Sequence, residues 1–174
     1  MIQVAAGASL ATFVCTAAWS DARTHRIPNQ LTVAGLVAAL ILRAPLGVDA
    51  FLHGLAGVCI AFVLCLILYA VRAIGAGDVK LLAGIGAFMG SSEIVGAMAL
   101  MAVLGAAFAL VSVIRRGVLP LLLLYTLDLV KSLRSFGRAG QLRRLESPGS
   151  LTIPYALPIA VGTLLWWFGR GIQL

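Results

Sequence analysis

The sequence predicts an all-α membrane protein, a polytopic bundle of six transmembrane helices with an added amphipathic helix on the cytoplasmic side. Three observations carry this prediction. Of the 174 residues, 61% are hydrophobic and only 11% are charged, whereas a typical soluble domain has about 25% charged residues. The apolar residues form long unbroken runs, which is typical of membrane spans. These runs lack the alternation of barrel strands, and helices are the other structure that can cross a bilayer.

The first three spans are separated by short polar segments. Residues 2–20 form the first apolar run, and we expect it to be retained as a span because no Lys or Arg precedes it. Pro28 fits the first turn of a helix, which places the second span at 29–46. The third span is predicted at 50–73. Arg43, with the Pro and Gly that follow it, is expected to mark an outer loop.

The second half of the chain is less uniform. A short fourth span is predicted at 79–90 and a fifth at 94–114, with Ser91-Ser92-Glu93 as the outer turn between them. The segment 117–150 combines leucines at roughly helical spacing with many cations, which predicts an amphipathic helix on the membrane surface and a basic loop. The last span is predicted at 151–168. All six spans are expected to form a single membrane-embedded domain over residues 1–174.

The positions of the basic residues predict the orientation. With the N-terminus outside, eleven of the thirteen Lys and Arg residues fall on the inner side and two on the outer side, as the positive-inside rule requires. The net charge of +7 is therefore assigned to topology and to anionic lipid, and no nucleic-acid partner is expected because no basic stripe on a soluble module is present. No internal repeat is visible, which disfavours a transporter of inverted repeats.

Cysteine and histidine give no sign of a metal site. Cys15, Cys59 and Cys65 lie inside apolar runs without a Cys-x-x-Cys pair, which is typical of small buried hydrophobic residues. His25 is expected to be an interfacial residue and His53 a packing residue. We therefore expect neither a metal nor a cofactor.

Asp78 has two interpretations. An Asp in front of an apolar run is a favoured helix N-cap, and Gly75 and Gly77 are then a simple break between helices. Alternatively, Asp78 is one carboxylate of a proteolytic pair in which one group is protonated and the other ionised. The bare glycine backbone would then let an extended substrate strand lie close to the enzyme.

Asp21 is the candidate partner. On its own it is read most simply as a solvated residue of the loop after the first span. However, of the six acidic residues only Asp21 and Asp78 lie at inner helix ends next to a span and outside the basic loop. Ionisable groups near membrane depth are costly and usually functional, so the pair favours a catalytic role.

Three motifs resemble those of type IV prepilin peptidases. The stretch from Asp21 to Ile27-Pro28-Asn29 resembles the first catalytic motif of that family. Residues 75–81, Gly-Ala-Gly-Asp-Val-Lys-Leu, are similar to its second motif, Gly-x-Gly-Asp, which presenilin-like proteases share. Ile153-Pro154-Tyr155 resembles a third element, and the number and order of spans match across essentially the whole chain.

The resemblance implies an aspartyl endopeptidase of the bacterial inner membrane that cleaves the leader of prepilins or pseudopilins on the cytoplasmic side. Asp21 and Asp78 would be the catalytic pair, with Gly75, Gly77, Lys80 and Pro154 in the active-site loops. The sequence contains no Cys-x-x-Cys pair, so we expect no extra N-terminal region of the kind that carries such pairs in many family members. The chain then resembles the short form of tight-adherence (Flp-type) pilus systems, without N-methyltransferase activity. For Lys80, a topology-setting charge is the simpler interpretation.

Two other functions remain open. A small proton-coupled permease could use Asp21 and Asp78 as a proton relay, since intramembrane carboxylates also serve in transport. A non-catalytic assembly subunit is a third possibility, although a scaffold has no need of the paired carboxylates.

Overall fold

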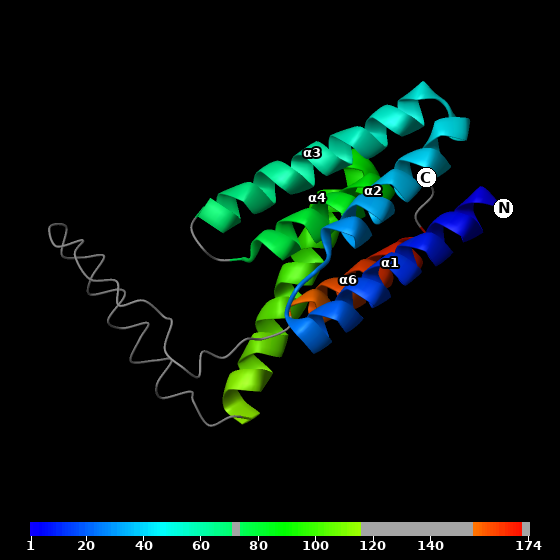
Figure 1. Ribbon diagram of the computed structural model, residues 1–174. Coiled ribbons are helices and arrows are strands. Elements are labelled where there is room, and N and C mark those ends of the chain that lie inside the picture. The colour runs from blue at the N-terminus through cyan, green and yellow to red at the C-terminus, as the bar shows by residue number, and fades with distance from the viewer. Residues whose placement is uncertain (71–73, 116–154, 172–174) are drawn as a thin grey trace, which may run out of the picture. The chain divides into compact units, whose positions relative to one another are not determined.

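The computed structural model describes residues 1–70, 74–115 and 155–171 (Figure 1). Within these ranges the chain is helical and contains no strand, which confirms the all-α class. The elements are α1 (Ile2–Thr24), α2 (Asn29–Arg43), the 3-10 turn η1 (Ala44–Leu46), α3 (Val48–Ala70), α4 (Ala76–Arg115) and α6 (Ala156–Arg170).

In the part of the chain that the structure describes, four segments are long and apolar enough to cross a membrane: α1, α2 continued through η1, α3 and α4. The predicted number of six spans stays a prediction. In the most apolar window of α3 only 22% of the residues are buried inside the protein, and large side chains such as Phe62 and Ile67 point outward. An outward apolar surface of this extent suits lipid and not water. The predicted amphipathic helix and basic loop of 117–150 lie outside the described residues.

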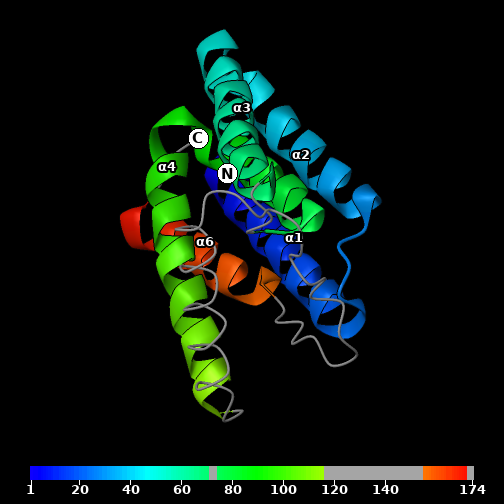
Figure 2. The ribbon, with the colours of Figure 1, turned by 90° about the vertical axis from the view of Figure 1, so that its left-hand side faces the viewer.

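The chain divides into two compact units, residues 1–105 with 154–174 and residues 106–153. In the first unit, α1 packs against both α2 and α6, and α2 packs against α3 (Figures 1 and 2). Of the second unit, the structure describes the end of α4, where the Ser112 hydroxyl donates to the Phe108 carbonyl at 2.8 Å.

Several helix bounds differ from the predicted spans, among them the start of α4 at Ala76 instead of residue 79, and two of these differences affect the site and the break in α4. The helix predicted to end at residue 20 continues to Thr24, because polar residues end an apolar run without ending a helix. It stops at His25, which adopts the left-handed conformation (φ 50°) and donates its N–H to the Asp21 carbonyl. Asp21 therefore lies in the last helical turn and not in a loop.

The predicted outer turn at residues 91–93 is helical instead. The break falls at Gly90, whose φ of 76° divides α4 into a first arm, residues 76–89, and a second arm, residues 91–115. Glycine adopts this conformation without the steric cost that a side chain would add. The two arms correspond to the fourth and fifth predicted spans.

The first arm of α4 forms the core of the first unit. Residues 81–90 are all buried, and the Phe88 ring stacks on Phe13 of α1 with 6.3 Å between centroids. Glycines bring α3 and the first arm together: a Cβ at Gly57 would collide with the Gly86 carbonyl and lie 2.9 Å from the Gly90 Cα. Small residues at helix contacts are the usual basis of close packing in membranes.

Gly57→Ala is therefore expected to destabilise the fold by about 1–3 kcal/mol, the usual cost of overpacking a well-packed contact. The matched control is Gly105→Ala, because a Cβ at that helical position meets nothing within 4 Å and should be neutral or stabilising by about 0.5–1 kcal/mol. Thermal unfolding of the purified variants in detergent measures both. Equal stabilities would contradict the close approach of α3 and α4.

Arg43 was expected in an outer loop, but it is the last residue of α2 and is buried. Its side chain is only 3% exposed, and it donates to three backbone carbonyls, those of Ala87 at 2.8 Å, Phe88 at 2.9 Å and Ala50 at 3.0 Å. The carbonyls at the end of a helix lack partners within that helix. The Gly90 break leaves such carbonyls on the first arm, and the Arg43 guanidinium caps them while placing a cation at the negative end of the helix dipole.

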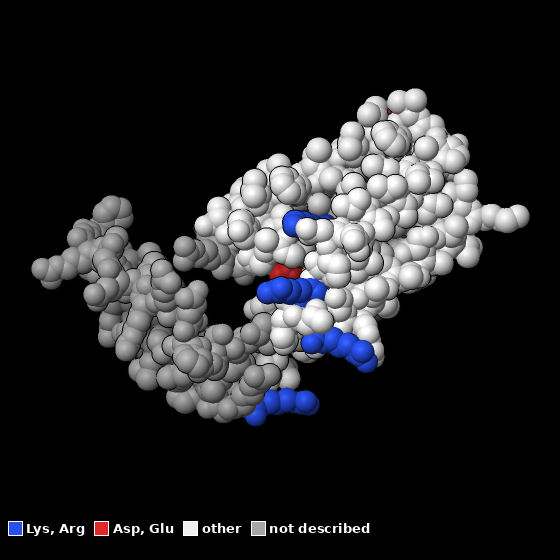
Figure 3. Space-filling model, in the orientation of Figure 1, with Lys and Arg blue, Asp and Glu red and all other residues white. Residues whose placement is uncertain are grey.

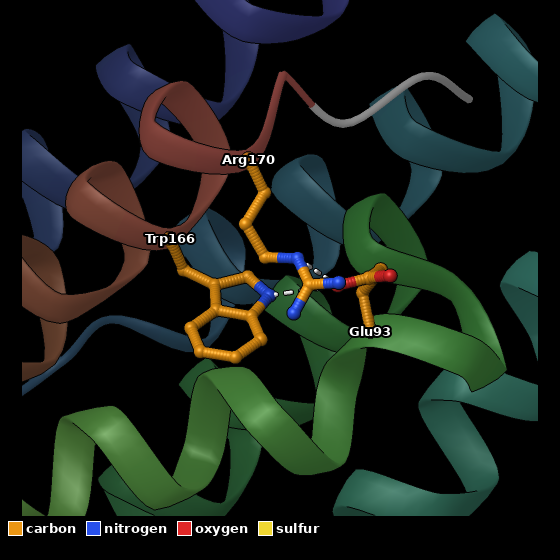
Figure 4. A network of polar contacts seen from close by, with 3 residues as sticks. All are labelled: Glu93, Trp166 and Arg170. Carbon is orange, nitrogen blue, oxygen red and sulfur yellow. Dashed lines mark hydrogen bonds and ion pairs between the residues drawn. The ribbon is translucent and has the colours of Figure 1, made fainter.

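The second arm of α4 is joined to α6 by a polar network (Figure 4). The Trp166 indole N–H donates to Glu93 at 3.0 Å, and Arg170 forms an ion pair with the same oxygen at 3.4 Å. The Arg170 guanidinium also lies over the Trp166 ring, 5.0 Å from its centroid. These contacts fix the C-terminal end of α6, the helix whose N-terminal end reaches Asp21.

Candidate active site

Asp78 lies in the first turn of α4 and is half-buried. Its Oδ2 accepts the backbone N–H of Gly75 at 3.2 Å, and its own N–H donates to the Gly75 carbonyl at 3.1 Å. A side chain at the third helical position that reaches back to the residue before the helix is half of a capping box. One carboxylate oxygen of Asp78 therefore does help to cap the start of α4, as the capping interpretation predicts. However, Asp78 lies inside the first turn of the helix and is not the N-cap residue itself.

Asp21 is held from the opposite end of the chain. Its Oδ2 accepts the backbone N–H of Ala156, the first residue of α6, at 3.2 Å. A carboxylate in the last turn of α1 faces the negative end of that helix dipole, whereas the start of α6 offers unpaired N–H groups and a positive end. The two helices run antiparallel, since Gly7 near the start of α1 lies beside Trp167 near the end of α6.

Both carboxylates line one cavity of about 360 Å³, which is within the usual size range of small-molecule sites. Figure 3 shows acidic atoms on this face with basic side chains around them. The lining residues are Asp21, His25, Arg26, Ile27, Asn29, Gly75, Ala76, Gly77, Asp78 and Lys80.

The wall opposite α4 is the segment that joins α1 to α2. The Ser20 hydroxyl donates to the Arg26 carbonyl at 2.9 Å, and the Thr24 hydroxyl, which lies 2.9 Å from the Ser20 carbonyl, is also 3.2 Å from the Arg26 carbonyl. This double contact folds the segment back against the end of α1. Further along, the Lys80 ammonium donates to the Asn29 side-chain oxygen at 2.8 Å, which joins α4 to the start of α2.

Five of the six candidate site residues meet at this cavity: Asp21, Asp78, Gly75, Gly77 and Lys80. The sixth, Pro154, lies outside the described residues. Sequence reasoning assigned no site role to Asn29, although it stands in the quoted Ile-Pro-Asn motif. It could not have found the Ala156 amide, because a backbone N–H carries no sequence signal of its own.

Gly77 does not require a left-handed conformation, because its φ is not positive. A Cβ added there would meet the Ile27 side chain at 3.6 Å, an ordinary contact. Backbone strain therefore does not explain the glycine at this position.

The cysteines and His53 differ from expectation. Cys15 and Cys59 are exposed on the outside of the helices and only Cys65 is buried. His53 is exposed and its Nδ1 lies 2.8 Å from the Ser91 hydroxyl, so it is not a packing residue. Within residues 1–70, 74–115 and 155–171, no group of three or more His, Cys, Asp or Glu side chains could hold a metal ion.

The fold and the cavity define a class of protein: a membrane-embedded helical protein with two carboxylates facing one water-accessible space. A family model described as the type IV leader peptidase family matches residues 8–110. The chain belongs to this family, and the resemblance noted from its motifs is confirmed. No curated protein and no solved structure was found to match the chain. Membership makes the protein a membrane peptidase of the prepilin leader-peptidase type.

Proposed function

We propose that the protein is an aspartyl endopeptidase of the bacterial inner membrane that removes the leader of Flp-like type IV prepilins at the cytoplasmic face. The observation that carries this proposal is the shared cavity: Asp21 on α1 and Asp78 on α4 are 57 positions apart in sequence (78 − 21) and line the same space. In peptide hydrolysis by two carboxyls, one proton is shared between them.

In the proposed reaction the ionised carboxyl takes a proton from a water molecule as that water adds to the scissile carbonyl carbon. The protonated carboxyl donates to the carbonyl oxygen. Collapse of the tetrahedral intermediate then breaks the C–N bond, and the amine leaves with a proton from the dyad. Each Asp keeps one oxygen on a backbone amide, Gly75 for Asp78 and Ala156 for Asp21, so the carboxyls are oriented before substrate arrives.

The proposed orientation rests on charge. Arg23, Arg26 and Lys80 lie at the cavity end of the helices, and Arg23 stacks over Trp19, 4.2 Å from the ring centroid. Trp and Arg together are typical of a membrane interface, and an excess of cations is typical of the cytoplasmic side. At the opposite end, the sequence predicts two cations, Arg43 and Arg170, and the charge of Arg43 is buried inside the protein. The cavity end is therefore proposed to be cytoplasmic.

The direct test is cleavage by the purified protein in detergent of an Flp-like prepilin that carries its leader and its apolar helix. Mass spectrometry of the products should show one new N-terminus at the leader junction, and cleavage should persist in EDTA because the dyad needs no metal. Loss of cleavage in EDTA with recovery on addition of zinc would assign the chemistry to a metal instead. Proton-coupled uptake by proteoliposomes, without cleavage, would favour the permease.

Gly77 provides a separate test of the proposed substrate position. Because a Cβ at Gly77 fits beside Ile27, Gly77→Ala should keep the thermal stability of the wild type. If a substrate strand lies against this backbone, Gly77→Ala and more strongly Gly77→Val should lower kcat/KM, by about tenfold or more for a contact worth about 1.4 kcal/mol. Gly105→Ala is the control at an open helical position. A fully active Gly77→Val would remove the substrate strand from this position.

A further inference from the structure

We propose that the hydrogen bond between Lys80 and Asn29 positions the two carboxylates, a role that rests on the peptidase activity proposed above. The Lys80 ammonium lies 2.8 Å from the Asn29 side-chain oxygen, and the two residues are 51 positions apart. Both line the cavity that holds Asp21 and Asp78. Among the described residues this hydrogen bond joins the two side chains to each other and not to Asp21 or Asp78, so the proposed effect of the pair runs through the position of the carboxylates.

The hydrogen bond connects two segments of the chain that line the cavity. Asp21 lies at the end of α1, and the segment 25–28 leads from there to Asn29, the first residue of α2. Lys80 lies on α4 two residues after Asp78, so the bond joins the Asp21 side of the cavity to the Asp78 side. Ile27 also lies close to Gly77, since a Cβ at Gly77 would be 3.6 Å from its side chain, but such an apolar contact has no preferred direction. A hydrogen bond between side chains adds a defined distance and angle.

The geometry separates this role from two simpler ones. Side chains two positions apart on a helix do not face each other, and the Lys80 bond runs across to α2, so Lys80 is not arranged as the counter-ion of Asp78. A charge that only sets topology needs no partner. Both members of the pair are exposed, where a hydrogen bond contributes little to folding. Loss of the bond should therefore appear in the rate of cleavage and not in the stability.

The kinetic test compares Lys80→Met, which removes the donor, with Lys80→Gln, which keeps a neutral N–H donor. Lys80→Met and Asn29→Ala should each lower kcat by about 10- to 100-fold, the scale of a displacement of about 1 Å in a catalytic site, with KM and thermal stability close to wild type. The double variant should be no slower than the slower single variant, because both remove one interaction. Lys80→Gln should retain most of the rate.

Three kinetic results would overturn the proposal. Multiplying losses in the double variant would mean that the two residues act independently. A Lys80→Gln as slow as Lys80→Met, beside an active Asn29→Ala, would assign the effect to the charge of Lys80 on substrate or lipid. A loss of rate that follows a loss of melting temperature would make the bond structural only.

A distance measurement tests the pair without relying on cleavage. Spin labels on cysteines introduced at Ala22 and Ala76, with the native cysteines replaced by Ser, report the separation of the end of α1 and the start of α4. Lys80→Met should broaden this distance distribution and Lys80→Gln should not, whereas an unchanged distribution in Lys80→Met overturns the positioning role. Absence of cleavage by the wild type would instead refute the proposed function, so the two failures are distinguishable.

Discussion

Replacement of either Asp21 or Asp78 by Asn is expected to abolish leader cleavage while the protein still inserts and folds. The oxygen of an Asn amide can still accept the backbone N–H that each carboxylate accepts, from Ala156 for Asp21 and from Gly75 for Asp78. The amide can neither take a proton from water nor return one. Because positioned proton transfer contributes about 10²–10⁴-fold and both carboxyls take part in the proposed mechanism, a loss of about 10³-fold or more is expected.

The measurement is the single-turnover cleavage rate of each purified variant beside its thermal stability. Asp49→Asn is the matched control, because Asp49 is an exposed Asp in the first turn of α3 that does not line the cavity. Asp49→Asn should cleave at the wild-type rate. Cleavage at that rate by either Asp21→Asn or Asp78→Asn would exclude the two-carboxylate mechanism, whatever the family of the protein.

Arg43→Met is expected to have the largest effect on stability. Met fills much of the volume of the arginine stem but donates no hydrogen bond, so the carbonyls of Ala87 and Phe88 lose their partner inside the protein. Each buried carbonyl left unpaired costs about 1–3 kcal/mol, so a loss of about 3 kcal/mol or more is expected. Arg43→Lys should recover only part of it, because a single ammonium does not reproduce the planar fork of the guanidinium.

Arg170→Met is the matched control. Arg170 is 58% exposed and forms an ion pair with Glu93, an arrangement that contributes about 0–1 kcal/mol. Thermal unfolding in detergent should thus separate the two variants clearly. If Arg43→Met had the same melting temperature as Arg170→Met, the three hydrogen bonds from Arg43 to backbone carbonyls would not stabilise the break in α4.

The predictable part of the structure was the part that depends on local sequence. Apolar runs located the helices because spanning segments must be long and apolar, and both arms of α4 were anticipated. The end of α1 was misplaced because Ser20 to Thr24 are polar without breaking a helix. The turn between the two arms was predicted at residues 91–93 instead of at Gly90, because the two serines and the glutamate there are also common in turns.

The contacts that shape the candidate site were not predictable in the same way. Arg43 bonds carbonyls 44 and 45 residues away, and Asp21 accepts an amide 135 residues away. A backbone group has no identity in the sequence, so such partners appear only when the helices are packed. The pairing of Asp21 with Asp78 could be predicted from the sequence for two reasons. Both are acidic residues at helix ends in a chain with few such residues, and their motifs resemble those of a known family.

The amide of Ala156 has a practical consequence for protein engineering. The segment that matches the family model ends at residue 110, and it contains both carboxylates but not the helix that holds one of them. A fragment trimmed to that segment would keep the acidic pair and release Asp21 from its only interhelical amide in the described part of the chain. If Asp21 has the proposed role, we expect a minimal enzyme to need α6, either in the same polypeptide or as a separate peptide that complements the fragment.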